Sequence, residues 1–153
     1  MNLTYLPNEN YFERPQTLEV SKIFSAVTLA EFDAQAKTEN IPDTHYKQRC
    51  INSAENMAQE FIKASISGRV LQTYFENACG TIDLPYGANM ILNVQDKDQN
   101  DIHYEAKGLT NVYLHFSSYY PEVVITYESG YQDALSIPEN IKMAILKITD
   151  CLA

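Results

Sequence analysis

The segment from Asp43 to Gly68 constrains the fold more than any other, because no proline or glycine interrupts it between these two residues. Asp43 follows a proline, and its carboxylate can accept the free backbone N–H groups of a first helical turn. The apolar residues that recur at the spacing of one helix face are Cys50, Ala54, Met57 and Phe61. Gly68 has the conformational freedom that a helix C-cap needs. We therefore predict a central helix over about residues 43–67, on which the rest of the chain packs.

Two capping patterns predict shorter helices on either side of this segment. TLAE at 28–31 is a capping box, in which the threonine hydroxyl and the glutamate carboxylate each accept a backbone N–H at the helix start. It predicts a helix over about residues 28–39. SIPE at 136–139 repeats the pattern, with proline in the first turn where its missing N–H costs nothing. It predicts a helix over about residues 137–152, whose apolar face is Ile141, Ala144, Ile145, Ile148 and Leu152.

Between the last two predicted helices, short runs of β-forming residues alternate with turn residues. The runs are VLQTYFENAC at 70–79, TIDLP at 81–85, MILNVQ at 90–95, IHYEAK at 102–107, NVYLHF at 111–116 and EVVITYES at 122–129. We predict an α+β fold. A short helix, a long central helix and a C-terminal helix form a small bundle, and an antiparallel β region over about residues 70–129 is inserted between the last two helices.

Residues 1–27 precede this single predicted domain of residues 28–153. Pro7 and Pro15 break any regular pattern in the segment. It is nevertheless too apolar for an unstructured tail, with Leu3, Tyr5, Leu6, Tyr11 and Phe12. We expect an N-terminal arm that lies either on its own domain or on a neighbouring subunit, and the sequence leaves both possibilities open.

The composition argues against several classes of function. The chain has 153 residues and a formal net charge of -9, and its Lys and Arg residues are scattered, whereas nucleic-acid-binding surfaces cluster them. Its three cysteines show no CxxC spacing, which favours a reducing compartment over a disulfide framework. The first residues lack the basic and apolar regions of a signal peptide, and no apolar run approaches the ~20 residues that span a bilayer. We therefore expect a soluble protein made inside a cell, without a membrane partner.

No pattern in the chain predicts catalysis or a metal site. DKDQND at 96–101 matches three positions of a calcium loop, but Asp101 replaces the required glycine and Lys107 the required glutamate, so a solvated hairpin turn is favoured. The histidines have no metal-ligand spacing, although His103 and His115 fall in neighbouring predicted strands where they can face each other. Nucleotide-binding, hydrolase and zinc-protease motifs do not occur, so we expect neither an enzyme nor a cofactor. The eleven tyrosines fit either an interface or a solvated sheet face.

The order of five motifs resembles a known class of protein. TLAEFDAQAK at 28–37 is followed by SGRVL at 67–71, LPYG at 84–87, YESGY at 127–131 and IPENIKMAILKI at 137–148. This order is similar to that of the head–tail connector (adaptor, or head-completion) proteins of tailed phages, over about residues 28–152. The Tyr-x-x-Gly-Tyr turn with the helix after it is the most specific part, and LPYG supports it.

The resemblance implies a structural protein of the virion, located at the capsid–tail junction after assembly in the host cytoplasm. It implies a homo-oligomeric ring of about a dozen copies on the portal protein, which extends and seals the DNA channel. DNA would pass without specific binding, and tail or neck proteins would dock on the ring. The candidate portal-side residues are Ile141, Lys142, Met143, Ile145 and Leu146. The candidate inter-subunit or tail-side residues are Pro85, Tyr86, Gly87, Tyr119 and Tyr120.

Two other functions remain open on the sequence alone. A tail-completion or tail-terminator protein of the phage neck is usually dominated by a sheet with one packed helix. A small ligand-binding or hydrolytic domain would need a pocket with convergent polar groups, which no motif here indicates.

Overall fold

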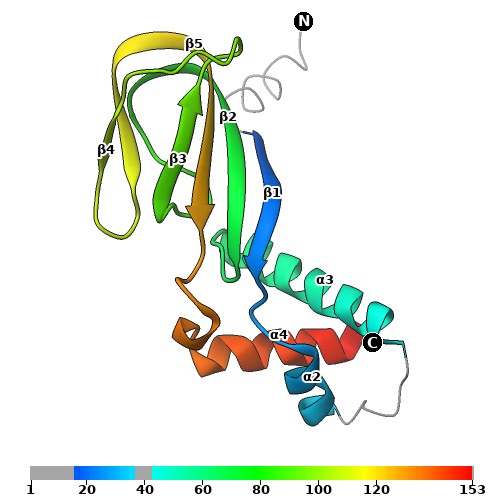
Figure 1. The fold of residues 1–153 in the computed structure, drawn as a ribbon. Coiled ribbons are helices and arrows are strands. Elements are labelled where there is room, and N and C mark those ends of the chain that lie inside the picture. Colours follow the sequence, from blue (N-terminus) through cyan, green and yellow to red (C-terminus); the bar gives the residue numbers. More distant parts are fainter. Residues whose placement is uncertain (1–15, 37–42, 153) are drawn as a thin grey trace, which may run out of the picture. The chain divides into compact units, whose positions relative to one another are not determined.

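Five strands form one antiparallel sheet in the computed structural model, which describes residues 16–36 and 43–152. The strand order is β1-β2-β5-β3, and β4 pairs with β5 (Figure 1). The strands are β1 (Gln16–Phe24), β2 (Gly68–Ile82), β3 (Met90–Gln95), β4 (Glu105–Lys107) and β5 (Tyr113–Ser129). The helices are α2 (Leu29–Ala36), α3 (Thr44–Ile62) and α4 (Glu139–Leu152), with a short 3-10 helix, η1 (Ala134–Ser136), before α4.

The chain divides into two units, each with its own core. Among the described residues, the sheet unit comprises residues 16–21 and Val70–Ser129, and the helical unit comprises residues 22–36, 43–69 and 130–152. The largest buried apolar side chains of the sheet unit are Leu71, Leu114, Phe116, Ile125 and Tyr127. Those of the helical unit come from α2, α3, α4 and their connections, and include Val27, Phe32, Ile51 and Ile145.

Strand β5 organises the sheet unit, because β3 and β4 pair with different parts of it. Val94 of β3 lies opposite Ile125, and Ala106 of β4 lies opposite Leu114. The pairing of β3 shifts by one residue between Ile91 and Asn93. The prediction that Val123, Ile125 and Tyr127 share one face of a strand is confirmed, since all three are fully buried.

The predicted helix starts at Thr28 and Asp43 are confirmed. The Glu31 carboxylate accepts the Thr28 N–H at 3.0 Å, and the Thr28 hydroxyl accepts the Glu31 N–H at 3.1 Å, which completes the capping box of α2. The Asp43 carboxylate accepts the Tyr46 N–H at 2.9 Å and caps α3. At the third predicted start, Ser136 instead belongs to η1 and donates its hydroxyl to Asp133 at 2.9 Å.

The predicted end of the central helix is wrong, because α3 ends at Ile62 and Gly68 begins strand β2. Lys63 has left-handed backbone angles, with φ 57° and ψ 40°, and terminates the helix without a glycine. The Gln59 side chain accepts the backbone N–H groups of Ile66 and Ser67, at 2.7 and 3.1 Å. These bonds take the place of the backbone hydrogen bonds of a further helical turn. The apolar spacing of the segment does not reveal this role of the Gln59 side chain.

The predicted buried face of α3 is also partly wrong. Cys50, Ile51 and Ala54 are buried, but Met57 is 54% exposed and Phe61 is 89% exposed. The buried face instead continues through the polar residues Glu55 and Gln59. Tertiary hydrogen bonds therefore decide which way the last turns of α3 face, and these bonds leave the apolar residues in solvent.

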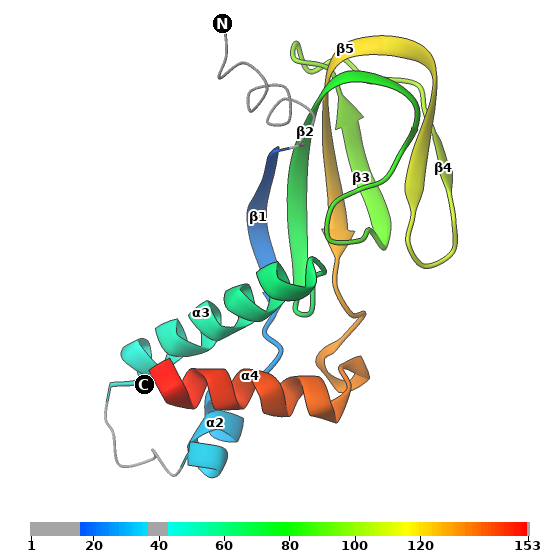
Figure 2. The ribbon, with the colours of Figure 1, turned by 180° about the vertical axis from the view of Figure 1, so that it is seen from behind.

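The α+β class and the three helices are confirmed, but the predicted arrangement of a helical bundle with an inserted β region is wrong. Strand β1 precedes the helices and is the edge strand next to β2, as both ribbon views show (Figure 1 and Figure 2). Its residues lie within the segment of residues 1–27, for which the sequence predicts an irregular arm. Pairing with β2, about 50 residues further along the chain, gives this segment its structure, and local patterns contain no signal of such pairing. Residues 1–15 of the predicted arm lie outside the described residues.

Candidate interaction surfaces

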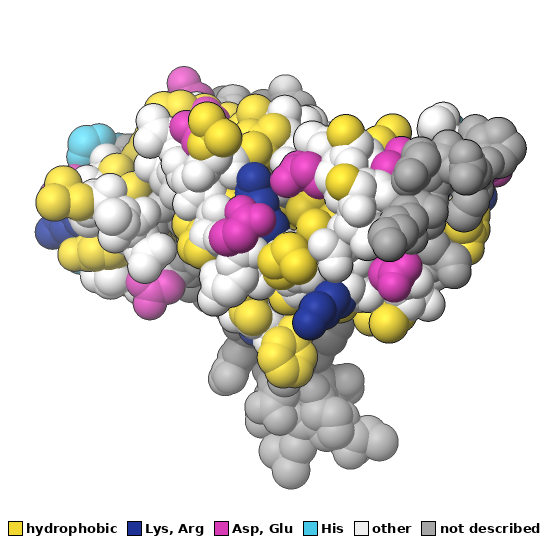
Figure 3. Space-filling view, turned by 90° about the horizontal axis from the view of Figure 1, so that it is seen from below, with side chains coloured by type: hydrophobic (Ala, Val, Ile, Leu, Met, Phe, Trp, Pro, Cys, Tyr) yellow, Lys and Arg dark blue, Asp and Glu magenta, His cyan; other side chains and the backbone are white. Residues whose placement is uncertain are grey.

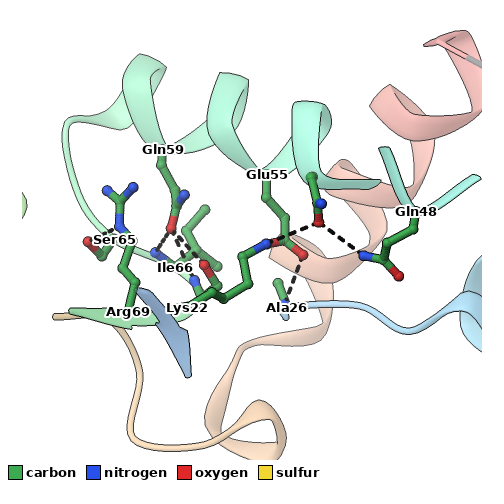
Figure 4. A network of polar contacts seen from close by, with 10 residues as sticks. Lys22, Ala26, Gln48, Glu55, Gln59, Ser65, Ile66 and Arg69 are labelled. Atoms are coloured by element: carbon green, nitrogen blue, oxygen red, sulfur yellow. Dashed lines mark hydrogen bonds and ion pairs between the residues drawn. The ribbon is translucent and has the colours of Figure 1, made fainter. Parts of the chain in front are cut away.

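A network of polar contacts along α3 holds the helical unit together. The fully buried Glu55 side chain lies 2.8 Å from the Lys22 ammonium and accepts the Ala26 N–H at 3.0 Å (Figure 4). Lys22 also donates to the Asn52 side chain at 3.2 Å. One turn after Glu55, the Gln59 side chain faces the segment that leads into β2. Two residues of one helix therefore fix the chain both before α2 and after α3.

Two further ion pairs attach α2 to the other helices. The Lys47 ammonium of α3 lies 2.8 Å from the Asp33 carboxylate, and its side chain is only 3% exposed. The Lys142 ammonium of α4 lies 3.8 Å from the Glu31 carboxylate. Because burial removes both lysines from water, loss of either acidic partner would leave a poorly solvated charge. Lys47 and Lys142 thus serve the internal packing of this unit.

The candidate portal-side residues on α4 belong to the core of the helical unit. Ile145 is fully buried, Leu146 is 5% exposed and Lys142 is 8% exposed. Ile141 and Met143 are half-buried and pack against the same core. The structure thus brings the four apolar candidates together in one core. Of these four, Ile141 and Met143 remain partly accessible to solvent. A portal contact through this helix stays a prediction, and it would involve Ile141 and Met143 before the others.

The candidate LPYG turn is tied to strand β5. The Tyr127 hydroxyl donates to the Pro85 carbonyl at 2.7 Å, and the Ser129 hydroxyl donates to the Tyr86 carbonyl at 3.2 Å and to that of Gly87. Pro85, Tyr86 and Gly87 are all half-buried. The turn is therefore a fixed part of the sheet unit that presents part of its surface to solvent.

The two candidate tyrosines in the middle of β5 differ in their surroundings. Tyr119 is 58% exposed, and its hydroxyl donates to the Asn77 side chain. Tyr120 is half-buried and packs edge to face on Phe116, with ring centroids 5.9 Å apart. Tyr119 is therefore the more accessible of the two for a partner protein.

Exposed apolar side chains that the sequence analysis did not single out occur in both units. In the helical unit they include Ile62, next to the exposed Phe61, and Leu135 of η1, which are 50% and 94% exposed. In the sheet unit, Leu18 and Val20 of β1 and Leu109 after β4 are 64, 54 and 101% exposed. The sequence analysis did identify Phe61, as an apolar residue at helical spacing. It predicted a buried position for this residue, whereas the side chain is 89% exposed.

The electrostatic character of the surface is mixed and acidic. On the face seen from below in Figure 3, hydrophobic side chains alternate with acidic ones, and the basic side chains there do not merge into one patch. Among the described side chains in Figure 3, no cluster of Lys and Arg forms a phosphate-binding patch.

In the sheet unit, a hydrogen bond to the Glu122 carboxylate at 2.7 Å, with smaller effects of burial and charge, raises the pKa of Tyr74 to about 12.

The acidic turn at residues 96–101 is held by internal hydrogen bonds, and His115 is paired across two strands. The Asp96 carboxylate accepts the backbone N–H groups of Asn100 and Asp98, each at 2.9 Å, and these bonds lower the pKa of Asp96. His115 lies opposite Glu105 across β4 and β5, so His103 and His115 do not face each other as the sequence allowed. Within residues 16–36 and 43–152, no three His, Cys, Asp or Glu side chains are arranged to hold a metal ion. No described helix is long and apolar enough to cross a membrane.

Comparison with other proteins leaves the family open. No protein-family model matches this chain, and no curated protein matches it in sequence.

Proposed function

We propose that this chain is a structural head–tail connector of a tailed bacteriophage. Its copies form a ring on the portal protein, which extends and seals the DNA channel and offers a docking surface to tail proteins. The order of the five sequence motifs supports the proposal, because it resembles that of the connector class over about residues 28–152. Function in such a protein depends on contacts between chains, without a catalytic step.

The observation that carries the proposal is the grouping of exposed apolar side chains in both units. Met57, Phe61 and Ile62 are all at least half exposed near the end of α3. Leu18 and Val20 form a second group on β1. Single exposed apolar residues are common in monomers, but groups of them are typical of surfaces that another protein covers. A ring needs two such surfaces on each copy, because each copy contacts two neighbours.

The charge of the chain suits a channel wall that DNA passes without binding. The net charge is -9, and the buried Lys47 and Lys142 pair with acidic partners inside the helical unit. Repeated around a ring, this charge repels phosphate over a Debye length of about 8 Å at physiological salt. A basic lumen in an assembled ring would contradict this part of the proposal.

A tail-completion or tail-terminator protein is the second candidate, because two strands of the sheet are longer than the sequence predicted. Five strands, of which β2 and β5 have 15 and 17 residues, bring the chain closer to the sheet-dominated proteins of that class. The two candidates differ in their partner. A connector binds the portal directly, whereas a tail-completion protein binds the end of the tail.

The experiment that tests the proposal is cross-linking mass spectrometry on purified particles of the phage whose genome encodes this chain. We expect cross-links from its lysines to portal lysines and between copies of the chain. Cross-links to tail-tube protein without any to portal would favour the second candidate. Absence of the chain from purified particles would refute both.

A further inference from the structure

The last turns of α3 present a group of apolar side chains to solvent, here called the α3 patch (Met57, Phe61 and Ile62). Met57 and Phe61 are four residues apart, which places them side by side on the helix surface, and they are 54% and 89% exposed. Ile62 follows Phe61 and is 50% exposed. Adjacent exposed apolar residues of this kind mark a surface that another segment covers.

The exposure of the α3 patch does not come from a frayed helix end. Gln59 lies between Met57 and Phe61 in the sequence, is 1% exposed, and accepts the backbone N–H groups of Ile66 and Ser67 through its side chain (Figure 4). These bonds fix the turn that carries the patch to the segment that leads into β2. The patch is therefore preformed, and binding to it requires no ordering of the helix.

The size of the α3 patch suits a short segment better than a folded face. Because a phenylalanine side chain buries about 150–250 Å², the exposed apolar area of the patch is on the order of 300–400 Å². A stable interface between two folded faces buries about 800 Å² on each side. One or two aromatic side chains of a partner segment would cover the patch and add to other contacts between the chains.

Residues 1–15, which precede β1, supply a segment of this kind. Its large apolar residues include Leu3, Tyr5, Leu6, Tyr11 and Phe12. Residues 37–42, the undescribed segment before α3, contain only Ile41 as a large apolar residue. A stretch of 15 residues spans at most about 50 Å, so residues 1–15 are long enough to reach a neighbouring chain.

The direction of β1 favours the α3 patch of another copy over that of the same chain. Lys22 of β1 contacts Glu55 of α3 at 2.8 Å. At about 3.3 Å per residue, Gln16 lies about 20 Å before this contact along the strand. The chain would have to reverse at Gln16 and return along β1 to reach Phe61 of its own copy. It can reach a second copy without such a reversal.

The charges beside the α3 patch also fit this occupant. Glu60 and Lys63 flank the patch and lie 3.2 Å apart, so the two charges balance each other. Within residues 1–15, Glu13 and Arg14 likewise offset each other. A segment of mainly apolar and neutral residues can cover such a surface without leaving a charge unpaired, whereas a strongly charged partner would gain nothing from it.

We propose that residues 1–15 of one copy bind the α3 patch of a neighbouring copy, with aromatic side chains of the segment against Met57 and Phe61. This inference rests on the proposed function, because it assumes that copies assemble side by side in a ring. It identifies the occupant of the α3 patch as a second copy of this chain. Loss of the contact would also weaken binding to portal, because copies joined in a ring bind it together.

Cross-linking between two differently tagged chains tests the contact. One chain carries Asn10→Cys and the other Glu60→Cys, an exposed position beside the patch, and the exposed Cys79 and Cys151 are replaced by serine in both. With a short bismaleimide at about 0.1–1 mM protein, we expect the mixed product at roughly tenfold or more above the control. The control pairs Asn10→Cys with Lys147→Cys, an exposed position on α4. A mixed product at the control level would overturn the inference.

A chain that carries both Asn10→Cys and Glu60→Cys distinguishes the neighbouring copy from the chain's own segment. At about 1 μM protein, binding within one chain is favoured by its high effective concentration. We expect the intrachain product to stay at the level of a chain with Asn10→Cys and Lys147→Cys. A dominant intrachain product would show that the segment covers its own α3 patch, and the inference would be wrong.

Point variants measure the same contact without cross-linking. Phe12→Ser and Phe61→Ser should each weaken self-association about tenfold in sedimentation equilibrium. The double variant should weaken it little further, because both substitutions remove one shared contact. Leu135→Ser is the control, since it removes another side chain of the helical unit, 94% exposed, and should leave self-association unchanged.

The failure of this inference and that of the proposed function give different results. If Phe12→Ser and Phe61→Ser associate like the wild type while the wild-type chain cross-links to portal in particles, the segment contact is wrong and the connector proposal stands. If the tagged chains cross-link in solution but the chain is absent from particles, the connector proposal is wrong and the segment contact stands.

Discussion

Replacement of Glu55 by glutamine tests whether the helical unit depends on the polar network around α3. The Glu55 side chain is fully buried, lies 2.8 Å from the Lys22 ammonium and accepts the Ala26 N–H at 3.0 Å. Glutamine retains an oxygen for the Ala26 N–H but removes the negative charge. Lys22, whose side chain is 23% exposed, then keeps only its hydrogen bond to Asn52.

The cost of this change follows from the burial of the two partners. Removal of one partner from a fully buried ion pair costs about 3–5 kcal/mol. Because Lys22 reaches solvent, we expect Glu55→Gln to cost about 2 kcal/mol. Glu55→Ala should cost about 1–3 kcal/mol more, because it also leaves the buried Ala26 N–H without its acceptor. At about 2–4 °C per kcal/mol for a chain of this size, Glu55→Gln should lower the melting temperature by roughly 4–8 °C.

The assay is urea unfolding followed by circular dichroism, with a double-mutant cycle against Lys22→Met. We expect a coupling energy of about 1–2 kcal/mol between the two positions. The matched control is Glu60→Gln, which breaks an exposed pair with Lys63 at the end of the same helix and should change the unfolding free energy by less than about 0.5 kcal/mol. A Glu55→Gln variant as stable as this control would refute the reasoning.

Three other predictions test the backbone, a perturbed tyrosine and the exposed apolar group. Gly130→Ala should cost about 3 kcal/mol or more in urea unfolding, because its φ is +102° and a Cβ would overlap a backbone oxygen, whereas Gly80→Ala, in open space, should cost only about 1 kcal/mol. Tyr74 should ionise near pH 12 in an absorbance titration, and Glu122→Gln should return its pKa toward 10.0. Because the folded-state pKa is raised, the Tyr74 contact stabilises the fold below pH 10 and this stabilisation is lost as the pH rises toward 12. Phe61→Ser should change stability by less than about 0.5 kcal/mol and reduce portal binding in a pull-down, because the side chain is 89% exposed.

Each of these predictions has a contrary outcome. Equal stability of the two glycine variants would show that the close approach at Gly130 is not a constraint. A Tyr74 that ionises near the ordinary tyrosine pKa of 10.0 would mean that its bond to Glu122 does not persist in solution. A Phe61→Ser variant that loses several kcal/mol of stability would place that residue in the core of the helical unit.

The sequence predicted the elements that depend on local interactions. The starts at Thr28 and Asp43 involve residues three positions apart, so capping chemistry alone identified them. The face of β5 with Val123, Ile125 and Tyr127 followed from alternation, because one side of that strand faces the core. Such features need no knowledge of a distant partner.

The features that the sequence missed depend on contacts between distant residues. Strand β1 exists through its pairing with β2, and the end of α3 depends on bonds from Gln59 to the segment after the helix. Phe61 matched the apolar spacing of a core residue but is exposed, because Glu55 and Gln59 occupy the inner face. On α4, the apolar spacing correctly indicated a packed helix, and three of the five candidate portal-side residues are buried in that packing.

The most direct test of the account is an electron cryomicroscopy reconstruction of the neck of particles that contain this chain. The account predicts a ring of copies immediately beneath the portal, with an acidic wall around the DNA. A neck in which the chain is present as isolated copies, with Phe61 and Leu18 in solvent, would contradict it.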